Sequence, residues 1–547
     1  MNQNTKRRWL AALLGAAAGM VVFFLLYGTS TLHPTYDAWI LNGYDEWDIQ
    51  QHYAGWVLFR NSHWAFPLGL ADTIAAPDGT VISFTDSIPW VSIFFKALRG
   101  VLPSTFQWFG WYTLFCFAMQ GAAGALLCAR GQAKTGAGAL AFSTLGGLLF
   151  VMLPTLWERA FRHTALASQW LFLLALYAFL EYRQNLHSGT AKFPWAMPVL
   201  AFLAVGIHPY FLPLVMMCAL LAAVELGRQK KAWGRAALQF AASLAAAVVG
   251  GVLCGAIGSG TGASRSGYGD YSMNLNALIN PTSRGGYTWS RLYQVMPQQP
   301  GQYDGFNYLG LGVLALITAA LLFSLRQNTK TWWHRNGPVF AACVFLTLFA
   351  VSNKIYWDNT GIELPLPAKL LELCGIFRSS GRMFYLVAAC MVVYAVYTLR
   401  DRLPGRYAVL VLALFVGVQA FDLSAAAQQK RQKFADPINA TVVNNDQTAS
   451  LGAGHIQLLA AGEVREDRLR LLAILAGKQG LATNLDIAVS GSHPAAEASR
   501  ADTAARLAAV YVTTDGATWE NWQAVFAGDD SLNFFVADSC YFMVPAV

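Results

Sequence analysis

Long apolar runs separated by shorter polar segments occupy residues 1–425 of the chain. An apolar run of about 20 residues is long enough to cross the hydrocarbon core of a bilayer as one helix. The runs lie near residues 9–28, 105–128, 136–153, 164–181, 193–207, 209–226, 236–258, 308–325, 337–352, 383–399 and 407–423. The pattern therefore predicts a mainly α-helical membrane bundle of about 11 spanning helices.

Two segments depart from this pattern. Residues 88–102 are apolar but short and contain Lys96 and Arg99, so we expect them to lie on the membrane within a large first loop, residues 29–104. Beyond residue 425, strand-like runs at 456–460, 487–489, 508–513 and 533–544 alternate with helix-like stretches at 465–476 and 519–526. We interpret residues 426–547 as a small α/β domain with its own core.

The composition is that of an integral membrane protein. Of the 547 residues, 55% are hydrophobic and only 12% are charged, and the mean hydropathy is +0.39. A soluble domain carries about 25% charged residues. The net charge of +8 comes from basic clusters between the predicted spans, without interleaved aromatic residues. We therefore predict membrane lipid, and no nucleic acid, as a partner.

The basic clusters also predict the orientation, because Lys and Arg in short loops mark the cytoplasmic side. Crossings that start from a cytoplasmic N-terminus place every basic cluster inside, and the first loop and the C-terminal domain outside. Residues 193–226 must then cross twice, with a turn at 207–209, since proline disfavours helix at the preceding residue. One tilted helix is the alternative, and it would break the charge rule. Run 9–28 lacks a small-x-small cleavage site, which favours a retained helix over a signal peptide.

An acidic string at residues 44–53 follows the first predicted span. If it is helical, Asp45, Asp48 and His52 share one face, because residues three and four apart are neighbours on a helix. Ionisable residues grouped at a membrane surface are costly and mark function. This face suits a general base, a cationic substrate, or a metal ion held by the same three side chains. Solvation of a loop is the alternative for Asp45 and Glu46.

The other unusual polar strings fall on the same predicted side of the membrane. Arg378 and Arg382, four residues apart at a predicted helix entrance, suit an anion such as a lipid phosphate. Interfacial anchoring, helix capping and ordinary turns are the alternative interpretations of these strings. The candidate residues in them are Asp86, Arg162, His208, Tyr268, Tyr271, Asp304, Arg378 and Arg382.

An acid beside cations at the outer membrane surface suggests group transfer from a lipid-linked donor. The carboxylate would take a proton from the acceptor hydroxyl, and the cations would stabilise the leaving phosphate. Aromatic side chains would provide platforms for sugar rings. No Gly-x-Ser-x-Gly string supports a serine nucleophile. The eight cysteines lack metal-ligand spacing and are interpreted as small buried hydrophobic residues.

A resemblance to a known class emerges from these strings. One helix, a long outer loop that opens on acids, many further spans and a C-terminal outer domain resemble the GT-C membrane glycosyltransferases. Four strings are similar to those of a bacterial family of multi-span proteins grouped near GT-C enzymes. They are DIQQHY at 48–53, TDSIP at 85–89, GFNYLG at 305–310 and FRSSGR at 377–382. The resemblance covers roughly residues 1–425 and extends more loosely to the tail.

The resemblance implies transfer of a sugar from a polyprenyl-phosphate donor to a glycan, lipid or protein of the cell envelope, at the outer face of the bacterial cytoplasmic membrane. GT-C enzymes use a first-loop acid as base or metal contact, which implies Asp48, with Asp45 as the reserve. A divalent cation is the one candidate cofactor. The chain lacks a Trp-Trp-Asp acceptor motif, which argues against peptide glycosylation. The donor phosphate would contact Arg378, Arg382 and Arg162, and the substrates would contact His52, Asp86, His208, Tyr268, Tyr271 and Asp304.

Two other functions stay open. A flippase or exporter of a lipid-linked saccharide would carry ionisable residues near the bilayer midplane, whereas the predicted helix interiors here are almost free of charge. A non-catalytic assembly subunit would act through its outer domain, whose plain sequence permits this.

Overall fold

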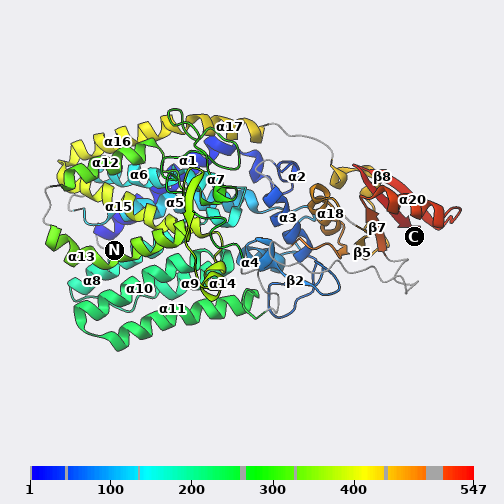
Figure 1. Cartoon of the computed structure of the whole chain (residues 1–547), viewed down its shortest axis with the longest axis horizontal. Helices are drawn as coiled ribbons and strands as arrows, with labels where there is room; N and C mark the ends of the chain where they lie inside the picture. Colours follow the sequence, from blue (N-terminus) through cyan, green and yellow to red (C-terminus); the bar gives the residue numbers. More distant parts are fainter. Residues whose placement is uncertain are drawn as a thin grey trace.

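The fold is dominated by helices (Figure 1). The computed structural model describes residues 3–43, 47–132, 136–258, 266–325, 329–435, 441–462, 464–487 and 509–546. Within these ranges eight helices are long and apolar enough to cross a membrane, and three apolar helices are shorter. The long ones are α1 (Gln3–Tyr27), α5 (Phe109–Ala129), α8 (Trp170–His187), α10 (Phe211–Lys230), α11 (Trp233–Cys254), α13 (Thr329–Val351), α15 (Phe384–Arg402) and α16 (Gly405–Asp422). The short ones are α6 (Ala137–Val151), α9 (Ala196–Ile207) and α12 (Leu311–Ser324).

These helices occupy the positions of the predicted apolar runs, and the mainly helical, multi-pass fold is confirmed. The segment that was expected to turn at 207–209 does so. Helix α9 ends at Ile207, His208 is extended (φ −161°, ψ 126°), and α10 begins at Phe211. Pro209 explains the break, because its ring disfavours helical backbone at the preceding residue.

Small residues let the first helices approach closely. A Cβ atom added at Gly15 of α1 would lie 2.3 Å from the carbonyl oxygen of Gly121 in α5. Side chains larger than glycine would therefore separate α1 from α5. Glycine at such contacts is typical of packed membrane helices, whose association depends on close van der Waals contact.

The segment between α1 and α5 folds into short elements at one end of the bundle. They are α2 (Ala38–Leu41), α3 (Trp47–Phe59), β1 (Leu70–Ala71), β2 (Thr80–Val81), the 3-10 turn η2 (Ile82–Thr85) and α4 (Pro89–Ala97). Helix α4 has nine residues and is too short to span, as expected for residues 88–102. The acidic string is helical from Trp47 onward. Asp45 and Glu46 lie outside the described residues.

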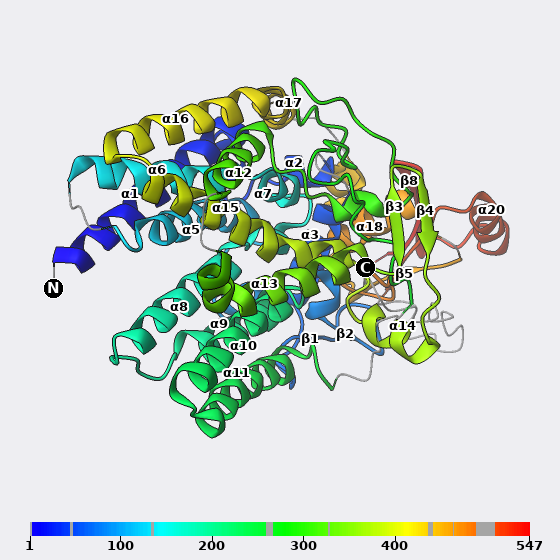
Figure 2. The same ribbon diagram turned by 60° about the vertical axis from the view of Figure 1, so that its left-hand side comes forward.

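The remaining connections that matter for function gather at this same end. They are α7 (Pro154–Arg159), η3 (Thr164–Ala167), η4 (Gln302–Gly305), the antiparallel pair β3 (Lys354–Trp357) and β4 (Thr360–Glu363), α14 (Ala368–Gly375) and η5 (Ser380–Met383). Figure 2 shows β3, β4 and α14 on the side that faces the C-terminal sheet. The opposite end of the bundle carries the chain's N-terminus and short connections.

The last part of the chain forms a five-stranded sheet with helices. Its elements are α17 (Ser424–Ala435), η6 (Val442–Asn444), η7 (Asp446–Thr448), β5 (Gln457–Ala460), α18 (Glu466–Lys478), β6 (Ala482–Thr483), β7 (Ala509–Thr513), α20 (Gly516–Val525), β8 (Leu532–Ala537) and β9 (Cys540–Pro545). The strand order is β6-β5-β7-β9-β8, with β6, β5 and β7 parallel and the last two antiparallel. The small C-terminal α/β region is thus confirmed.

Two predicted strands need correction. The single strand expected over 533–544 is a hairpin, because Asp538 and Ser539 have φ values of 49° and 59° and turn β8 into β9. Of the strand expected at 487–489, Ile487 is not in a strand, and the next two residues lie outside the described ranges. Short apolar runs do not distinguish one strand from two when the turn contains no glycine.

The C-terminal region packs directly on the first loop. Helix α18 lies against α3, and a Cβ added at Gly477 would lie 2.6 Å from Val57 Cγ2. Next to this contact, Lys478 Nζ lies 2.7 Å from Asp37 Oδ2 in a mostly buried ion pair. The backbone N–H of Thr483 also donates to the carbonyl oxygen of Thr73 at 3.0 Å. Helix α3 is therefore held between the bundle and the sheet region.

Candidate active site

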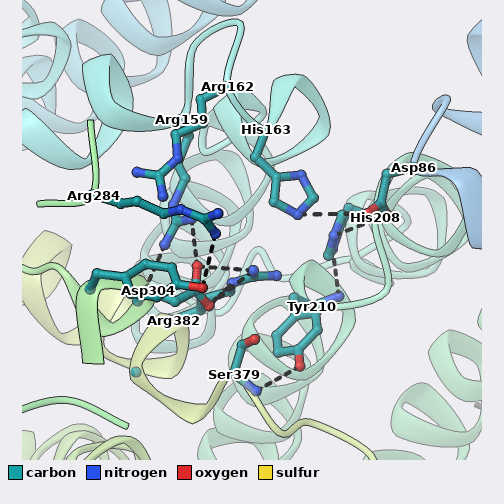
Figure 3. Close-up of polar contacts among 12 residues, drawn as sticks. Asp86, Arg159, Arg162, His163, His208, Tyr210, Arg284, Asp304, Ser379 and Arg382 are labelled. Atoms are coloured by element: carbon teal, nitrogen blue, oxygen red, sulfur yellow. Dashed lines mark hydrogen bonds and ion pairs between the residues drawn. The ribbon is translucent and has the colours of Figure 1, made fainter. Parts of the chain in front are cut away.

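A buried group of arginines surrounds one carboxylate, that of Asp304 in η4 (Figure 3). Arg159 Nη1 donates to Asp304 Oδ1 at 2.6 Å, and Arg159 Nη2 donates to the Asp304 carbonyl oxygen at 2.6 Å. Arg382 contacts both carboxylate oxygens, with Nε at 3.0 Å and Nη2 at 3.1 Å. Tyr385 Oη accepts a further bond from Arg159 Nε. Two guanidinium groups thus share one acid.

The electrostatics of this group leave net positive charge. Burial alone would raise the pKa of Asp304, but the charges of Arg159 and Arg382 lower it well below its usual range. Asp304 therefore stays ionised, and it balances one of the two arginines. A buried cationic surplus at a helix end suits a bound anion.

A second group, formed by Asp86 and three histidines, lies beside the first. Asp86 follows η2 with φ 54° and ψ 22°, a left-handed conformation that aspartate tolerates better than most residues. Its two carboxylate oxygens face His163 Nε2 at 3.7 Å and His208 Nε2 at 3.6 Å. The ring of His52, from α3, lies 5.4 Å from that of His163, centroid to centroid. We call Asp86, His52, His163 and His208 the imidazole cluster.

Burial sets the protonation of the imidazole cluster. It raises the pKa of Asp86 to about 7, with Arg382 opposing the rise and Asp48 adding to it. It lowers the pKa of His52 to about 4, and it lowers the pKa of His163 and His208 well below the usual range. At neutral pH the three imidazoles are therefore uncharged, and Asp86 is close to its titration midpoint.

Part of the imidazole cluster fits a metal ion. One ligand atom from each of His52, Asp86 and His163 lies within 4.8 Å of the other two. Neutral imidazoles and a carboxylate are ligands for Zn²⁺ and related transition ions. The buried Nδ1 atoms of His52 and His163 have no hydrogen-bond partner in the described part of the chain. The predicted metal set was Asp45, Asp48 and His52. The structure brings His52 together with Asp86 and His163, and Asp45 lies outside the described residues.

Asp48 lies in the first turn of α3 and is half-buried. Its negative charge acts on both His52 and Asp86, which places it at the edge of the imidazole cluster. Within the described ranges its carboxylate forms no ion pair. Of the two predicted bases, Asp45 lies outside the described residues, and Asp48 has a carboxylate without an ion pair in the described ranges; Asp86, a predicted substrate contact, faces two imidazoles.

The predicted phosphate-binding arginines differ in whether they already form an ion pair with an acid. Arg382 shares Asp304, and Arg162 forms a buried ion pair with Glu158. Arg378 is half-buried over the ring of Tyr271, 5.6 Å from its centroid, and no ion pair to it is formed by any residue that the structure describes. The charge of Arg378 also acts on Asp86. Of these three arginines, Arg378 is therefore the one that can bind an anion without first breaking an ion pair with an acid of the described chain.

Arg378 and Arg382 lie just before α15, at the predicted helix entrance, but the two residues are not part of one helix. Helix α14 ends at Gly375, and only the short turn η5 (Ser380–Met383) precedes α15. Instead of sharing a helix face, the two arginines contact different tyrosines: Arg378 contacts Tyr271, and Arg382 lies 4.6 Å from the ring centroid of Tyr210.

The two predicted tyrosines contact different parts of the protein. The Tyr268 hydroxyl donates to the Phe349 carbonyl oxygen at 3.2 Å, so its polar end is used within the protein. Tyr271 lies beside Arg378, and its carbonyl oxygen accepts from the Gly381 N–H at 3.2 Å. Of the pair, Tyr271 borders the arginine group.

Four residues of the site were not selected from the sequence. Arg159 and His163 lie in the charged string 157–163, next to Arg162, which is a predicted contact of the donor phosphate. Arg284 is exposed and stacks 5.0 Å from the ring centroid of Tyr303, in an otherwise plain loop. Tyr210 binds the Ser379 N–H through its hydroxyl at 2.9 Å. For Arg284 the sequence carries no signal, and Tyr210 is recognisable only as a neighbour of His208, because both residues meet their partners only through tertiary packing.

The fold and the site together define a multi-pass membrane protein with a buried cluster of acids, imidazoles and arginines at one end of its helices. The chain belongs to the family described as a domain of unknown function, DUF6311, whose model matches residues 16–424. No curated protein matches it. Among solved structures it is similar to the archaeal oligosaccharyltransferase AglB from Archaeoglobus fulgidus, in complex with an inhibitory peptide and a dolichol-phosphate, at 11% identity and a TM-score of 0.40. The match covers 88% of this chain and 65% of that one, so the chain spans about two thirds of the length of AglB.

Proposed function

We propose that this protein transfers a sugar from a polyprenyl-phosphate donor to an acceptor of the cell envelope, at the outer face of the bacterial cytoplasmic membrane. One observation carries the proposal. Asp86 lies near the beginnings of α3, α10 and α15, close enough to Asp48, Arg378 and Arg382 for the charges of all three to act on its carboxylate. Acid and cation thus meet in one buried site.

In the proposed reaction, Asp48 accepts the proton of the acceptor hydroxyl as its oxygen forms a bond to the anomeric carbon of the donor sugar. The bond between that carbon and the phosphate oxygen breaks, and its electron pair leaves with the polyprenyl phosphate. General-base assistance of this kind contributes about 10²- to 10⁴-fold to a rate.

The arginines would bind the leaving phosphate. Arg378 is the primary contact, because its charge is not matched by an acid in the described part of the chain. Arg382 is fixed by Asp304 in a two-point ion pair, so it would present its charge in a preorganised position. Fixed cations at the site of developing charge stabilise a transition state without the cost of reorganisation.

His52, Asp86 and His163 would hold a divalent cation. When bound, such an ion would supply positive charge next to the donor phosphate. Loading it requires Asp86 to be ionised, and its raised pKa makes occupancy dependent on pH near neutrality. His208, on the other oxygen of Asp86, would then fix the orientation of the carboxylate.

The orientation follows from the positive-inside rule. The connections at the end of the bundle away from the site carry the basic clusters, including Arg130, Arg183, Arg335 and Arg400. We therefore place that end in the cytoplasm and the site outside, together with residues 426–547 as an extracytoplasmic domain.

Reconstitution tests the proposal. The purified protein is incorporated into vesicles that contain a polyprenyl-phosphate sugar, and products are separated from donor by mass spectrometry. A glycosidic product that is lost in Asp48→Asn and kept in Asp78→Asn supports the proposal. Asp78 is the matched control, because it is an exposed aspartate of the same loop. A change in donor sidedness without product would identify a transporter. A defect caused by surface changes in residues 441–546, with Asp48 freely replaceable, would identify an assembly subunit.

A further inference from the structure

A large cleft lies between helices α8, α13 and α15, away from the candidate active site. Its volume is about 1230 Å³, above the 300–1,000 Å³ that is typical of sites for drug-sized ligands. We call it the α13 cleft. It opens because α13 packs loosely: only 17% of its apolar window is buried in the protein, against 78% for the span that contains α15.

The two ends of the α13 cleft differ in chemistry. Near the start of α15 its wall is apolar and includes Leu348, Phe384 and Val387. Near the end of α15 it is lined by five arginines and one acid. Helix α15 has 19 residues, so about 28 Å separates the two ends, close to the thickness of the hydrocarbon core. The cleft therefore matches one long amphipathic ligand that lies along the membrane normal.

The arginines of the basic end are only partly neutralised. Arg130 pairs with Glu181 at 2.5 Å, Arg183 with Glu225 at 3.3 Å, and Arg400 with Asp401 at 2.8 Å. The other two, Arg335 and Arg402, are exposed, and neither forms an ion pair with a residue that the structure describes. Arg335 also lies close enough to Arg183 for their charges to interact unfavourably. An anion at this end would relieve that repulsion.

We propose that the α13 cleft binds an anionic glycerophospholipid of the cytoplasmic leaflet, with its phosphate at Arg335 and Arg402 and its acyl chains along α13 and α15. Charge complementarity favours this occupant, because unpaired arginines between membrane helices on the cytoplasmic side suit an anionic headgroup. The lipid would fill the gap behind α13 and hold it against α15. Since α15 begins at Phe384, two residues after Arg382, the lipid would also stabilise the segment that positions Arg382.

Native mass spectrometry of the full chain tests the proposal. The protein is extracted from nanodiscs that contain equal amounts of phosphatidylglycerol and phosphatidylcholine, and the retained lipid is counted and identified. We expect retained phosphatidylglycerol. The double variant Arg335→Gln, Arg402→Gln should bind it roughly 30-fold more weakly, from the contribution of two arginines near a membrane surface. The matched control is Lys6→Gln, Arg406→Gln, which removes two exposed charges from the same end outside the cleft.

A second variant tests the same cleft if the double variant is poorly folded. Val344→Trp fills the wall of the cleft and leaves the arginines intact, and it should also reduce retention. Equal retention of both lipids, or equal loss in the control variant, would overturn the proposal. Displacement of phosphatidylglycerol by an equimolar polyprenyl phosphate would also overturn it, because the cleft would then take the donor. Retention is read without turnover, so Asp48→Asn should keep the lipid even if the protein proves not to be a transferase.

Discussion

Arg382 contacts both carboxylate oxygens of Asp304, and both side chains are about nine-tenths buried. The pair joins η5 to η4, two turns that are far apart in the sequence and lie at the same end of the bundle. Because Asp304 also binds Arg159, this carboxylate fixes the relative position of three segments. Geometry and charge in the candidate active site thus depend on one acid.

Loss of Arg382 should therefore affect stability as well as activity. Arg382→Gln removes two charge-assisted hydrogen bonds from Asp304, which keeps Arg159, and we expect a loss of roughly 1.5–3 kcal/mol in the free energy of unfolding. Arg378→Gln should leave stability within about 0.5 kcal/mol of the native protein, since Arg378 has no ion pair in the described ranges. Denaturant titration in detergent measures both. Equal stability losses would show that Arg378 has a structural partner.

The same two variants should separate in kinetics. Arg378→Gln is expected to raise the KM for a polyprenyl-phosphate sugar and to lower kcat/KM by at least about tenfold, the effect of one charge-assisted contact. Arg378→Lys should recover only part of the loss, because lysine lacks the planar, forked donors of arginine. Unchanged kinetics in Arg378→Gln would remove this residue from the donor site.

Asp48→Asn should abolish transfer with little cost in stability. The carboxylate is half-buried and forms no ion pair with a described residue, so the amide should fit in its place. We expect transfer to fall by about 10²- to 10⁴-fold, the contribution of a general base. Product measured by mass spectrometry, alongside Asp78→Asn, gives the comparison. Wild-type product levels in Asp48→Asn would reject Asp48 as the base.

The pKa of Asp86 predicts a specific dependence of stability on pH. Between its usual value near 4 and its folded value of about 7, the folded protein holds a proton that the unfolded chain has released. This contribution is present at low pH and is lost as pH rises through 7. The melting temperature of the native protein relative to Asp86→Asn should therefore fall as pH is raised from 5 to 8.

The three histidines change stability with pH in the opposite direction, so their contribution must be separated from that of Asp86. His52, His163 and His208 have lowered pKa values, so they stabilise the folded state above their usual pKa near 6.5 and destabilise it as pH falls. They are present in both proteins, and the difference between native and Asp86→Asn removes most of their effect. A difference that stays constant with pH would mean that Asp86 is ionised throughout.

A divalent transition ion should stabilise the protein through the imidazole cluster. At 100 times its Kd, a ligand adds about 2.7 kcal/mol to the free energy of unfolding. We expect Zn²⁺ or Mn²⁺ to raise the melting temperature more at pH 8 than at pH 6, because Asp86 must lose its proton to bind. The response should vanish in His52→Ala and His163→Ala, and chelation should reverse it. His63→Ala is the control, since His63 and Asp72 form an exposed pair in the same loop.

Contact between α18 and α3 should be needed for activity although α18 carries no candidate catalytic residue. Gly477→Ala would place a Cβ atom 2.6 Å from Val57 Cγ2, so α18 must move away from α3, which carries Asp48. We expect lower stability and lower transfer in this variant. Gly516→Ala, where nothing lies within 4 Å of the added atom, should change neither. Normal transfer by Gly477→Ala would show that α3 holds its position without α18.

The sequence predicted the helices well because spanning length is a local property. Each apolar run is long enough, or nearly so, to be recognised alone, and even the break at His208 follows from the neighbouring Pro209. The hairpin β8–β9 was missed because its turn at Asp538 and Ser539 contains no glycine or proline. Local sequence patterns thus predict helices and strands, but they do not predict where an element ends when the turn residues are unusual.

The sequence predicted individual residues of the candidate site but not the contacts between them. Asp86, His208 and Asp304 were recognised as unusual polar residues, yet their partners come from distant segments and are set by tertiary packing. The spacing of Arg378 and Arg382 predicted a helix entrance, but Ser379 (φ −77°, ψ 62°) separates Arg378 from the turn η5 that holds Arg382. Asp86 faces His163 and His208 only because η2, η3 and the turn after α9 converge. A single sequence contains no local signal for such convergence.

The packing of α18 on α3 has a consequence for how the protein is made. Helix α3 is synthesised soon after the first span, whereas α18 is synthesised after all of the candidate spans. The surface of α3 around Val57 therefore stays uncovered while the rest of the chain is inserted, and it must remain free of other contacts until α18 arrives. Assembly around Asp48 is thus a late event in biogenesis, because α3 is packed on both sides only after every candidate span has been made.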